Sequence, residues 1–314
     1  MFDICVYGDA LMDMFRGDGA DAFIANCGGT CLNMAVCAAN LGLKTTFVGR
    51  VGDDVMGRRL ARVMTEHGID TRGLIMDSAY FTTLAFVELD HGERSFSFAR
   101  QYGADIMIHP EDIDQKAVRS ARLFHYSGMT LMAEPSRSTT LALLEQLHSE
   151  GMYICTDISY RHNLWSDPET AVRVTRQALP FTDLVKCSEE EALLMTGKED
   201  LKEAAEFFCS YGPQLVVITC GEQGAFWYRN GECGTKPPYK VEVVDTTGAG
   251  DAFFGGFLYQ LMQLDDPRSV TAAQLPGMIR FANAAGALNI RQKGGIDGAP
   301  TLAEVEELMR AQAQ

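Results

Sequence analysis

The chain has 314 residues, and its 42 acidic and 27 basic side chains give a formal net charge of −15. So negative a chain is a poor partner for nucleic acid or an anionic membrane surface. Nine scattered cysteines without a CxxC pair, and a start with no charged and apolar leader, predict a reduced, cytoplasmic protein that is neither exported nor anchored.

Two acidic residues follow the first predicted strand. Residues 2–7 are mostly apolar and predict a buried strand, and Asp9 and Asp13 come just after it. In open α/β sheets ligands bind at the carboxyl ends of the strands, where carboxylates can accept hydrogen bonds from sugar hydroxyls. The alternative is that both are solvated turn residues.

A glycine pair, Gly28-Gly29, precedes a helix predicted over residues 32–41. Such a pair allows the backbone to approach a ligand closely, and Asn33 can both donate to and accept from hydroxyls. Taken alone, this is also an ordinary loop and helix. Residues 55–67 then predict an amphipathic helix, and residues 81–98 a β-hairpin that turns at 90–93 and interrupts the strand–helix rhythm.

Strands and helices alternate beyond residue 110. The expected strands are 123–126, 153–156, 184–187 and 215–219, followed by a hairpin at 225–235 with Asn230-Gly231 as its turn. This alternation predicts an α/β fold with a doubly wound, mostly parallel sheet and helices on both faces. Ser188 and Glu191 fit a capping box that opens a helix.

The most informative stretch is residues 244–258. It is expected to leave an apolar strand at 241–244, turn through Gly248-Ala249-Gly250 and enter a helix with Asp251 in its first turn. The free N–H groups of such a turn bind anions. A neighbouring carboxylate suits phosphoryl transfer, because it can orient the attacking hydroxyl and take its proton.

Asp251 also has a plainer interpretation, since an acid in the first turn commonly stabilises a helix. A helix N-terminus is expected to lower the pKa of Asp251, which makes it a weak base. A loose transition state reduces this objection, because the hydroxyl then loses its proton late.

Residues 245–251, Asp-Thr-Thr-Gly-Ala-Gly-Asp, resemble the C-terminal signature of the ribokinase-like (PfkB-type) carbohydrate kinases. Residues 28–35 with 47–57 resemble the N-terminal signature, and residues 92–100 and 157–165 resemble the bacterial fructokinase branch. The resemblance covers essentially the whole chain. It implies one ribokinase-like catalytic domain over 1–314, with a discontinuous β lid from about residues 10–30 and 80–105 that can also serve as a homodimer surface.

This resemblance implies an ATP-dependent sugar kinase, with fructose as the leading substrate. The implied catalytic residues are the base Asp251, the anion-binding Gly248, Ala249 and Gly250, and Arg161 beside the transferring phosphoryl group. Sugar contacts are implied for Asp9, Asp13, Gly28, Gly29, Asn33 and Arg100. Nucleotide contacts are implied for Lys186, Ser188, Thr219, Gly221, Gly224 and Asn283. Mg²⁺ is expected at Glu191 through water, and K⁺ at Asp245 and Thr247.

Three positions depart from the fructokinase pattern: Ala99 replaces a Tyr, and Ser159 and Ser188 each replace an Asn. Other interpretations also stay open for two of the implied residues. Arg161 can be a surface residue, and the small-residue helix around Asn283 can serve close packing alone.

A rival substrate is 2-keto-3-deoxygluconate, whose kinases have an Arg at the position of Arg100 that is thought to hold the acid group. Asp13 favours a polyol, because a second acid would repel a carboxylate. Ribose or a nucleoside fits the sequence less well. A rival from another class is a non-catalytic sugar-binding or regulatory module, against which the intact Asp251 and its glycine turn argue.

Overall fold

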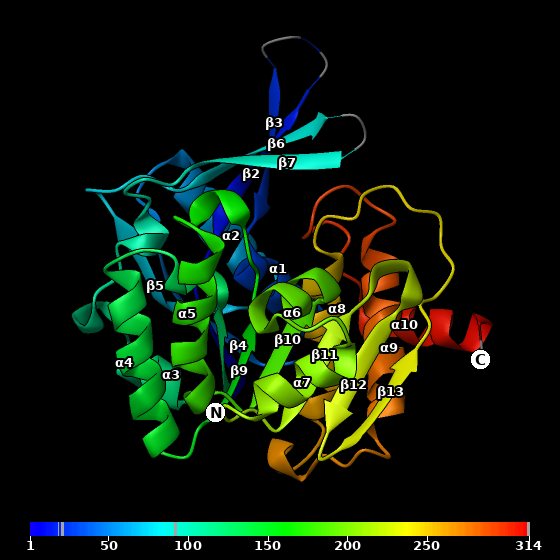
Figure 1. Cartoon of the computed structure of the whole chain (residues 1–314). Coiled ribbons are helices and arrows are strands. Elements are labelled where there is room, and N and C mark those ends of the chain that lie inside the picture. The colour runs from blue at the N-terminus through cyan, green and yellow to red at the C-terminus, as the bar shows by residue number, and fades with distance from the viewer. Residues whose placement is uncertain (18, 20–21, 91–92, 313–314) are drawn as a thin grey trace.

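The computed structural model describes residues 1–17, 19, 22–90 and 93–312. These residues form a large layered body and a small sheet that projects from it (Figure 1). None of the helices in these ranges is long and apolar enough to span a membrane.

The large sheet has the strand order β13-β12-β11-β10-β9-β8-β1-β4-β5 over the described residues. Pairing is parallel from β11 through to β5, and antiparallel only at β12 and β13. The predicted mostly parallel, doubly wound sheet is therefore confirmed. Its strands are β1 (Phe2–Tyr7), β4 (Thr45–Gly52), β5 (Asp70–Asp77), β8 (Ala121–Ser127), β9 (Tyr153–Asp157), β10 (Leu184–Ser188), β11 (Leu215–Thr219), β12 (Ala225–Arg229) and β13 (Glu232–Lys236).

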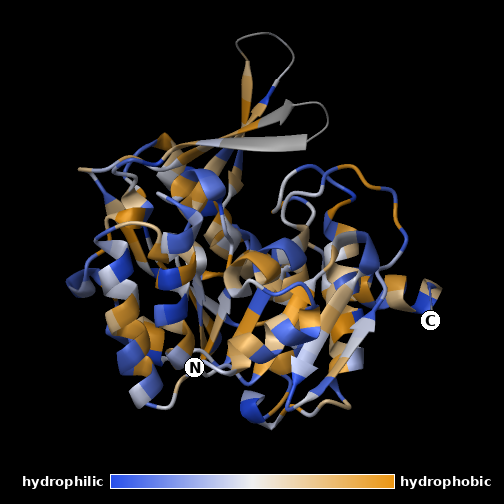
Figure 2. Ribbon diagram, in the orientation of Figure 1, coloured by the Kyte–Doolittle hydropathy of each residue, from blue (hydrophilic) through white to orange (hydrophobic). Residues whose placement is uncertain are grey.

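Helices cover both faces of this sheet because successive side chains of its strands point to opposite sides. Ile4 and Val6 of β1 join one apolar cluster, whereas Cys5 and Tyr7 join the other. Figure 2 shows many apolar residues in the inner strands, and helices along which hydrophilic and hydrophobic residues alternate. The first face holds α1 (Thr30–Asn40), α2 (Val55–Glu66), α8 (Ala249–Leu261) and α9 (Leu275–Asn289), with α10 (Leu302–Ala311) packed on α9. The second holds α3 (Gln115–Arg119), α4 (Ser136–Ser149), α5 (Pro168–Ala178), α6 (Glu189–Thr196) and α7 (Leu201–Cys209).

The small sheet has the order β3-β2-β6-β7 in the described part of the chain. Its strands are β2 (Leu11–Arg16), β3 (Phe23–Gly28), β6 (Leu84–Asp90) and β7 (Glu93–Ala99). They come from the two segments, at about 10–30 and 80–105, where a lid was expected. Residues 91 and 92 of the expected hairpin turn lie outside the described residues.

Two local predictions were incomplete or wrong. The strands β4 and β5 were not foreseen, and the sequence of β5 mixes charged residues with apolar ones. The strand expected at 241–244 is absent from the described structure: this segment is irregular, and Val243 and Val244 are 57% and 55% exposed. Two prolines follow β13 and cannot donate to a sheet ladder, and the N–H of Val244 instead donates to the carbonyl of Ile290.

Candidate active site

A cavity of about 750 Å³ lies at the carboxyl ends of the parallel strands, bounded by Ala85 and Phe98 of the small sheet. Most of the predicted site residues line this cavity, although they come from distant parts of the chain. These are Asp9, Asp13, Gly29, Asn33, Arg161, Lys186, Ser188, Glu191, Thr219, Gly221, Thr247, Gly248, Ala249, Gly250 and Asp251. Five predicted residues are not part of the lining: Gly28, Arg100, Gly224, Asp245 and Asn283.

The helix α8 begins at the cavity because of its glycine turn. Gly248 precedes the helix with φ 78°, a left-handed conformation that glycine adopts readily. A Cβ at this position would lie 2.5 Å from the Cα of Gly295, so the two chain segments can meet only without a side chain. The N–H groups of Gly250 and Asp251 then lie in the first turn, where no preceding carbonyl of the helix can accept from them.

Asp251 is buried at this helix end. Its Oδ2 accepts a hydrogen bond of 2.8 Å from Nδ2 of Asn33 on α1. Burial, reinforced by the nearby charge of Asp157, raises the pKa of Asp251 to about 7. The expectation of a lowered pKa was therefore wrong, because desolvation and a neighbouring carboxylate outweigh the helix dipole. A carboxylate with a pKa near neutral is well matched to general-base catalysis.

Lys186 and Asp157 form a buried ion pair beside the glycine turn, with 2.7 Å between Nζ and Oδ2. A Cβ at Gly250 would lie 2.9 Å from Nζ of Lys186, which places the ammonium next to the N-terminus of α8. Burial by itself lowers the pKa of Lys186, but the charges of Asp157, Glu191 and Asp251 raise it overall. Asp157 is the first residue of the 157–165 motif but was not among the predicted site residues, although its position after a predicted strand was a usable signal.

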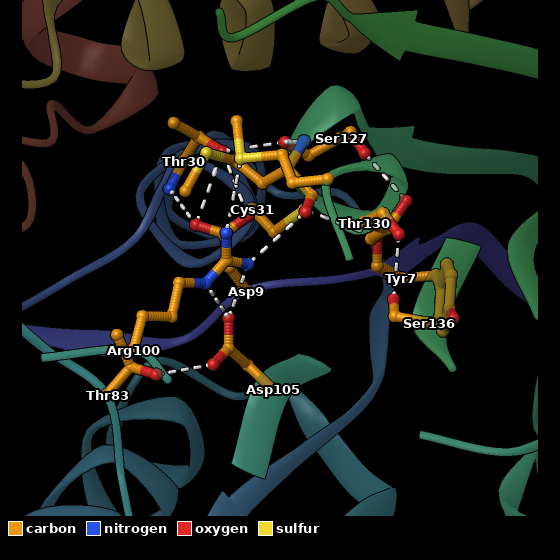
Figure 3. A network of polar contacts seen from close by, with 12 residues as sticks. Tyr7, Asp9, Thr30, Cys31, Thr83, Arg100, Asp105, Ser127, Thr130 and Ser136 are labelled. Atoms are coloured by element: carbon orange, nitrogen blue, oxygen red, sulfur yellow. Dashed lines mark hydrogen bonds and ion pairs between the residues drawn. The ribbon is translucent and has the colours of Figure 1, made fainter. Parts of the chain in front are cut away.

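The two carboxylates that were expected to contact sugar, Asp9 and Asp13, lie in different surroundings. Asp9 accepts from the N–H and the hydroxyl of Thr30, at 2.7 and 3.0 Å (Figure 3). Burial, with the charges of Asp251 and Asp9, raises the pKa of Asp13 to about 7. Gly28 leaves room for the Asp13 carboxylate, because a Cβ at position 28 would overlap it. Thr30 was not among the predicted residues.

Arg100 does not face the cavity as expected. Its Nε and Nη2 donate to Oδ2 of Asp105 at 2.8 and 2.6 Å, and Nη2 also donates to the carbonyl of Met129 at 3.2 Å (Figure 3). The side chain is only 5% exposed. In the structure this arginine forms an internal ion pair and is not among the residues that line the cavity.

Glu191 combines a structural role with a place in the cavity. Its Oε2 accepts from the N–H of Ser188 at 2.8 Å, which completes the predicted capping box, and its Oε1 accepts from the N–H of Tyr160 at 2.6 Å. Burial, followed by the charge of Asp157, raises the pKa of Glu191.

Arg161 lies next to Tyr160 in the loop after β9, and its Nη1 donates to the Tyr160 carbonyl at 2.9 Å. Ser159 has φ 47°, a left-handed conformation that an Asn adopts more easily.

Elsewhere in the cavity lining, Thr219 is the last residue of β11 and Gly221 follows shortly after it. Gly224 and Asn283 support this region from outside the lining. A Cβ at Gly224 would overlap the Lys236 carbonyl, and Nδ2 of Asn283 donates to the carbonyls of Lys236 and Pro237 at 3.1 and 2.9 Å. Both residues therefore hold the chain as it leaves β13.

Asp245 joins two loops below the glycine turn. Its Oδ1 accepts from the N–H of Thr247 at 2.8 Å and its Oδ2 from the N–H of Gly294 at 3.0 Å. It is buried behind Thr247, which lines the cavity. Within the described ranges, no group of three His, Cys, Asp or Glu side chains is arranged to bind a metal by itself.

Comparison with known proteins agrees with this geometry. Residues 1–302 match the family described as pfkB family carbohydrate kinase. The chain is 37% identical to fructokinase-1 of Oryza sativa subsp. japonica over 296 residues, 93% of this chain and 91% of that protein.

Solved structures of bacterial fructokinases share the fold. The fructokinase of Xylella fastidiosa with bound ATP has a TM-score of 0.93 and 31% identity, with 99% of each chain covered. A double mutant of the Vibrio cholerae O395 fructokinase, solved with fructose, ADP and a potassium ion, has a TM-score of 0.89 and 32% identity, with 98% of each chain covered. The chain therefore belongs to the pfkB family of carbohydrate kinases.

Proposed function

We propose that this kinase is an ATP-dependent fructokinase that transfers the γ-phosphoryl group to the terminal hydroxyl of fructose, with Asp251 as the base. The observation that carries this proposal is the position of Asp251, buried at the N-terminus of α8 in the same cavity as Asp9 and Asp13. The carboxylate orients the attacking hydroxyl and takes its proton, and the N–H groups of the first turn stabilise charge on the transferring phosphoryl group.

The charges at the sugar end support a neutral polyol. Asp9, Asp13 and Asp251 all line the cavity, so a substrate carboxylate would meet repulsion from several acids. The rival substrate 2-keto-3-deoxygluconate would need a cation to balance its acid group, and Asp105 already pairs with Arg100. Fructose also agrees with the rice relative and with the Vibrio cholerae protein solved with that sugar.

The phosphate end fits ATP and its Mg²⁺ ion. Oδ1 of Asp157 and Oγ of Ser159 are buried in the lining without a hydrogen-bond partner in the described residues, so groups remain free to meet a ligand. Lys186 and Arg161 would balance phosphate charge, with Ser188, Thr219 and Gly221 on the nucleotide side. Glu191 would hold Mg²⁺ through water, because both of its oxygens already accept backbone N–H groups. Mg²⁺ neutralises charge that develops on the phosphates.

Asp245 and Thr247 are the proposed ligands of a potassium ion behind the anion site. The carboxylate joins the loops around Thr247 and Gly294, and oxygen ligands suit a hard cation of this kind. The Vibrio cholerae protein solved with a potassium ion lends support. A cation here would stiffen the loop that leads into α8.

We further propose that the chain works as one catalytic domain whose small sheet closes over the sugar. Closure would exclude water and so limit ATP hydrolysis. The edge strand β3 presents Phe23 and Ile24, which are 41% and 54% exposed, and this surface suits a homodimer. Free cysteines along the chain are in keeping with a cytoplasmic location.

The test is ADP release from ATP, Mg²⁺ and K⁺ with fructose, tagatose, ribose, adenosine or 2-keto-3-deoxygluconate, each against a blank without sugar. Fructose should give the highest kcat/KM. A response confined to the keto acid would overturn fructose as the substrate but keep the kinase. Unchanged ATP with every sugar would instead favour a regulatory sugar-binding module.

A further inference from the structure

Arg100 and Asp105 form a buried ion pair at the root of the small sheet. Arg100 directly follows β7, and Asp105 lies in the short helical turn Ala104–Ile106. Oδ1 of Asp105 accepts from the hydroxyl of Thr83, the residue just before β6. The pair thus fastens the roots of both β6 and β7 at one point, and a Cβ on the intervening Gly103 would overlap the Thr83 hydroxyl.

One path leads from this ion pair to Asp9 (Figure 3). Nη2 of Arg100 donates to the carbonyl of Met129, whose N–H donates to Oγ of Ser127 at 3.1 Å. The Ser127 hydroxyl lies 3.0 Å from the hydroxyl of Thr30, and Thr30 in turn donates to the Asp9 carboxylate. Every link is a hydrogen bond between buried or half-buried groups, so the series of contacts is continuous from Arg100 to Asp9.

A second path leads to Asp13. The N–H of Met12 donates to the carbonyl of Thr83 at 3.1 Å, which sets the register in which Asp13 pairs with Ala85 of β6. The side chain of Thr83 is the one that Asp105 holds. Both acids at the sugar end are therefore positioned from the same ion pair.

We propose that Arg100, anchored by Asp105, is a positioning residue that holds the Asp9 and Asp13 carboxylates in the orientation that receives sugar hydroxyls. Arg100 acts through the Met129 carbonyl and through Asp105, without touching the substrate. The inference rests on the proposed sugar kinase function and gives the arginine a role other than that of a carboxylate clamp.

The test compares Arg100→Met, Arg100→Lys, Asp105→Asn and the Arg100→Met/Asp105→Asn double variant. Misplacing a binding group by about 1 Å can cost up to roughly 10²-fold, so KM for the sugar should rise roughly tenfold or more in Arg100→Met and Asp105→Asn. The kcat should change less, and KM for ATP should stay as in the wild type. The double variant should lose less than the product of the two single losses, because both single changes break the shared Arg100–Asp105 ion pair. Arg100→Lys should recover part of the loss, since it keeps the charge but not the two-pronged geometry.

Arg72→Met is the matched control, because the exposed Arg72 side chain pairs with the half-buried Asp70 at 2.8 Å and neither residue lines the cavity. It should leave the KM values for sugar and ATP unchanged. Ser127→Ala provides a second variant that keeps the ion pair and removes only the hydroxyl that contacts the Met129 N–H and the Thr30 hydroxyl. It should raise KM for the sugar in the same direction, by a smaller factor.

A wild-type KM for the sugar in Asp105→Asn, together with a large loss in Arg100→Met, would show a direct arginine–sugar contact and overturn the proposal. If thermal unfolding shows that the ion-pair variants do not fold, Ser127→Ala becomes the deciding variant. An unchanged KM for the sugar in Ser127→Ala would then contradict the proposed path from Arg100 to Asp9. All variants are assayed with the sugar that the wild type uses best. A wild type inactive on fructose therefore overturns that substrate without affecting the comparison of variants.

Discussion

Asn33 on α1 and Asp251 on α8 both line the cavity and share a hydrogen bond of 2.8 Å. The bond fixes the Asp251 carboxylate and stabilises its charged form. The other side-chain atom of Asn33, Oδ1, is buried without a partner in the described structure. The same amide can therefore hold the base and accept from a sugar hydroxyl.

The pH dependence of kcat/KM should reveal the raised pKa of Asp251. A base works in its ionised form, so activity should be constant above the pKa of about 7 and fall as the pH drops through it. Burial also raises the pKa of Asp13 to about 7, so the fall in kcat/KM at low pH (the acid limb of the profile) should reflect the protonation of both carboxyl groups. A profile that stays flat down to pH 5 would contradict this electrostatic account.

Two substitutions beside Asp251 should shift this limb in opposite directions. Asp157→Asn removes a negative charge that raises the pKa of Asp251, so the limb should move to lower pH. Lys186→Met removes a positive charge that lowers it, so the limb should move to higher pH. Each shift should be about one pH unit, as expected for a nearby charge. Shifts of the same sign in both variants would show that these charges do not control Asp251.

Gly28→Ala should weaken sugar use selectively. The added Cβ would overlap the Asp13 carboxylate and displace it, so kcat/KM for the sugar should fall roughly tenfold or more while KM for ATP is unchanged. Gly277→Ala on α9 is the matched control, because a Cβ there meets no atom within 4 Å. It should keep activity and stabilise the helix by up to about 1 kcal/mol. Equal sugar kinetics in both variants would remove Asp13 from the sugar site.

Asp245→Asn should abolish activation by potassium. The change removes the charge that attracts a cation but keeps an oxygen that can accept from the Thr247 N–H, a bond of 2.8 Å in the structure. ADP release in KCl and in choline chloride at equal ionic strength measures the effect. The wild type should be faster in KCl, and the variant should show no difference. Undiminished activation in the variant would place the cation elsewhere.

The sequence was informative wherever a function depends on local pattern. Ser188 and Glu191 form the capping box that their spacing predicted, and the turn at Gly248 opens α8 as expected. Asn230 and Gly231 have the positive φ values, 50° and 85°, that a tight hairpin turn requires. Each of these features depends on residues within one turn of each other.

The sequence was less informative where distant residues decide the outcome. The pKa of Asp251 depends on its burial and on Asp157, which only the folded sheet brings near. A sugar contact was expected for Arg100 from the resemblance of residues 92–100 to fructokinases, and the spacing did not reveal that Arg100 pairs with Asp105 and the Met129 carbonyl. Neither the depth of burial nor a partner across a loop can be read from spacing.

The most direct test of the account is Asp251→Asn, with turnover measured as ADP release and fructose binding measured by calorimetry. Because general-base catalysis contributes about 10²–10⁴-fold, turnover should fall by roughly 10²-fold or more while fructose affinity changes little. Asp265→Asn, at an exposed residue just after α8, should match the wild type in both measurements. Near-normal turnover in Asp251→Asn would contradict the assignment of Asp251 as the base.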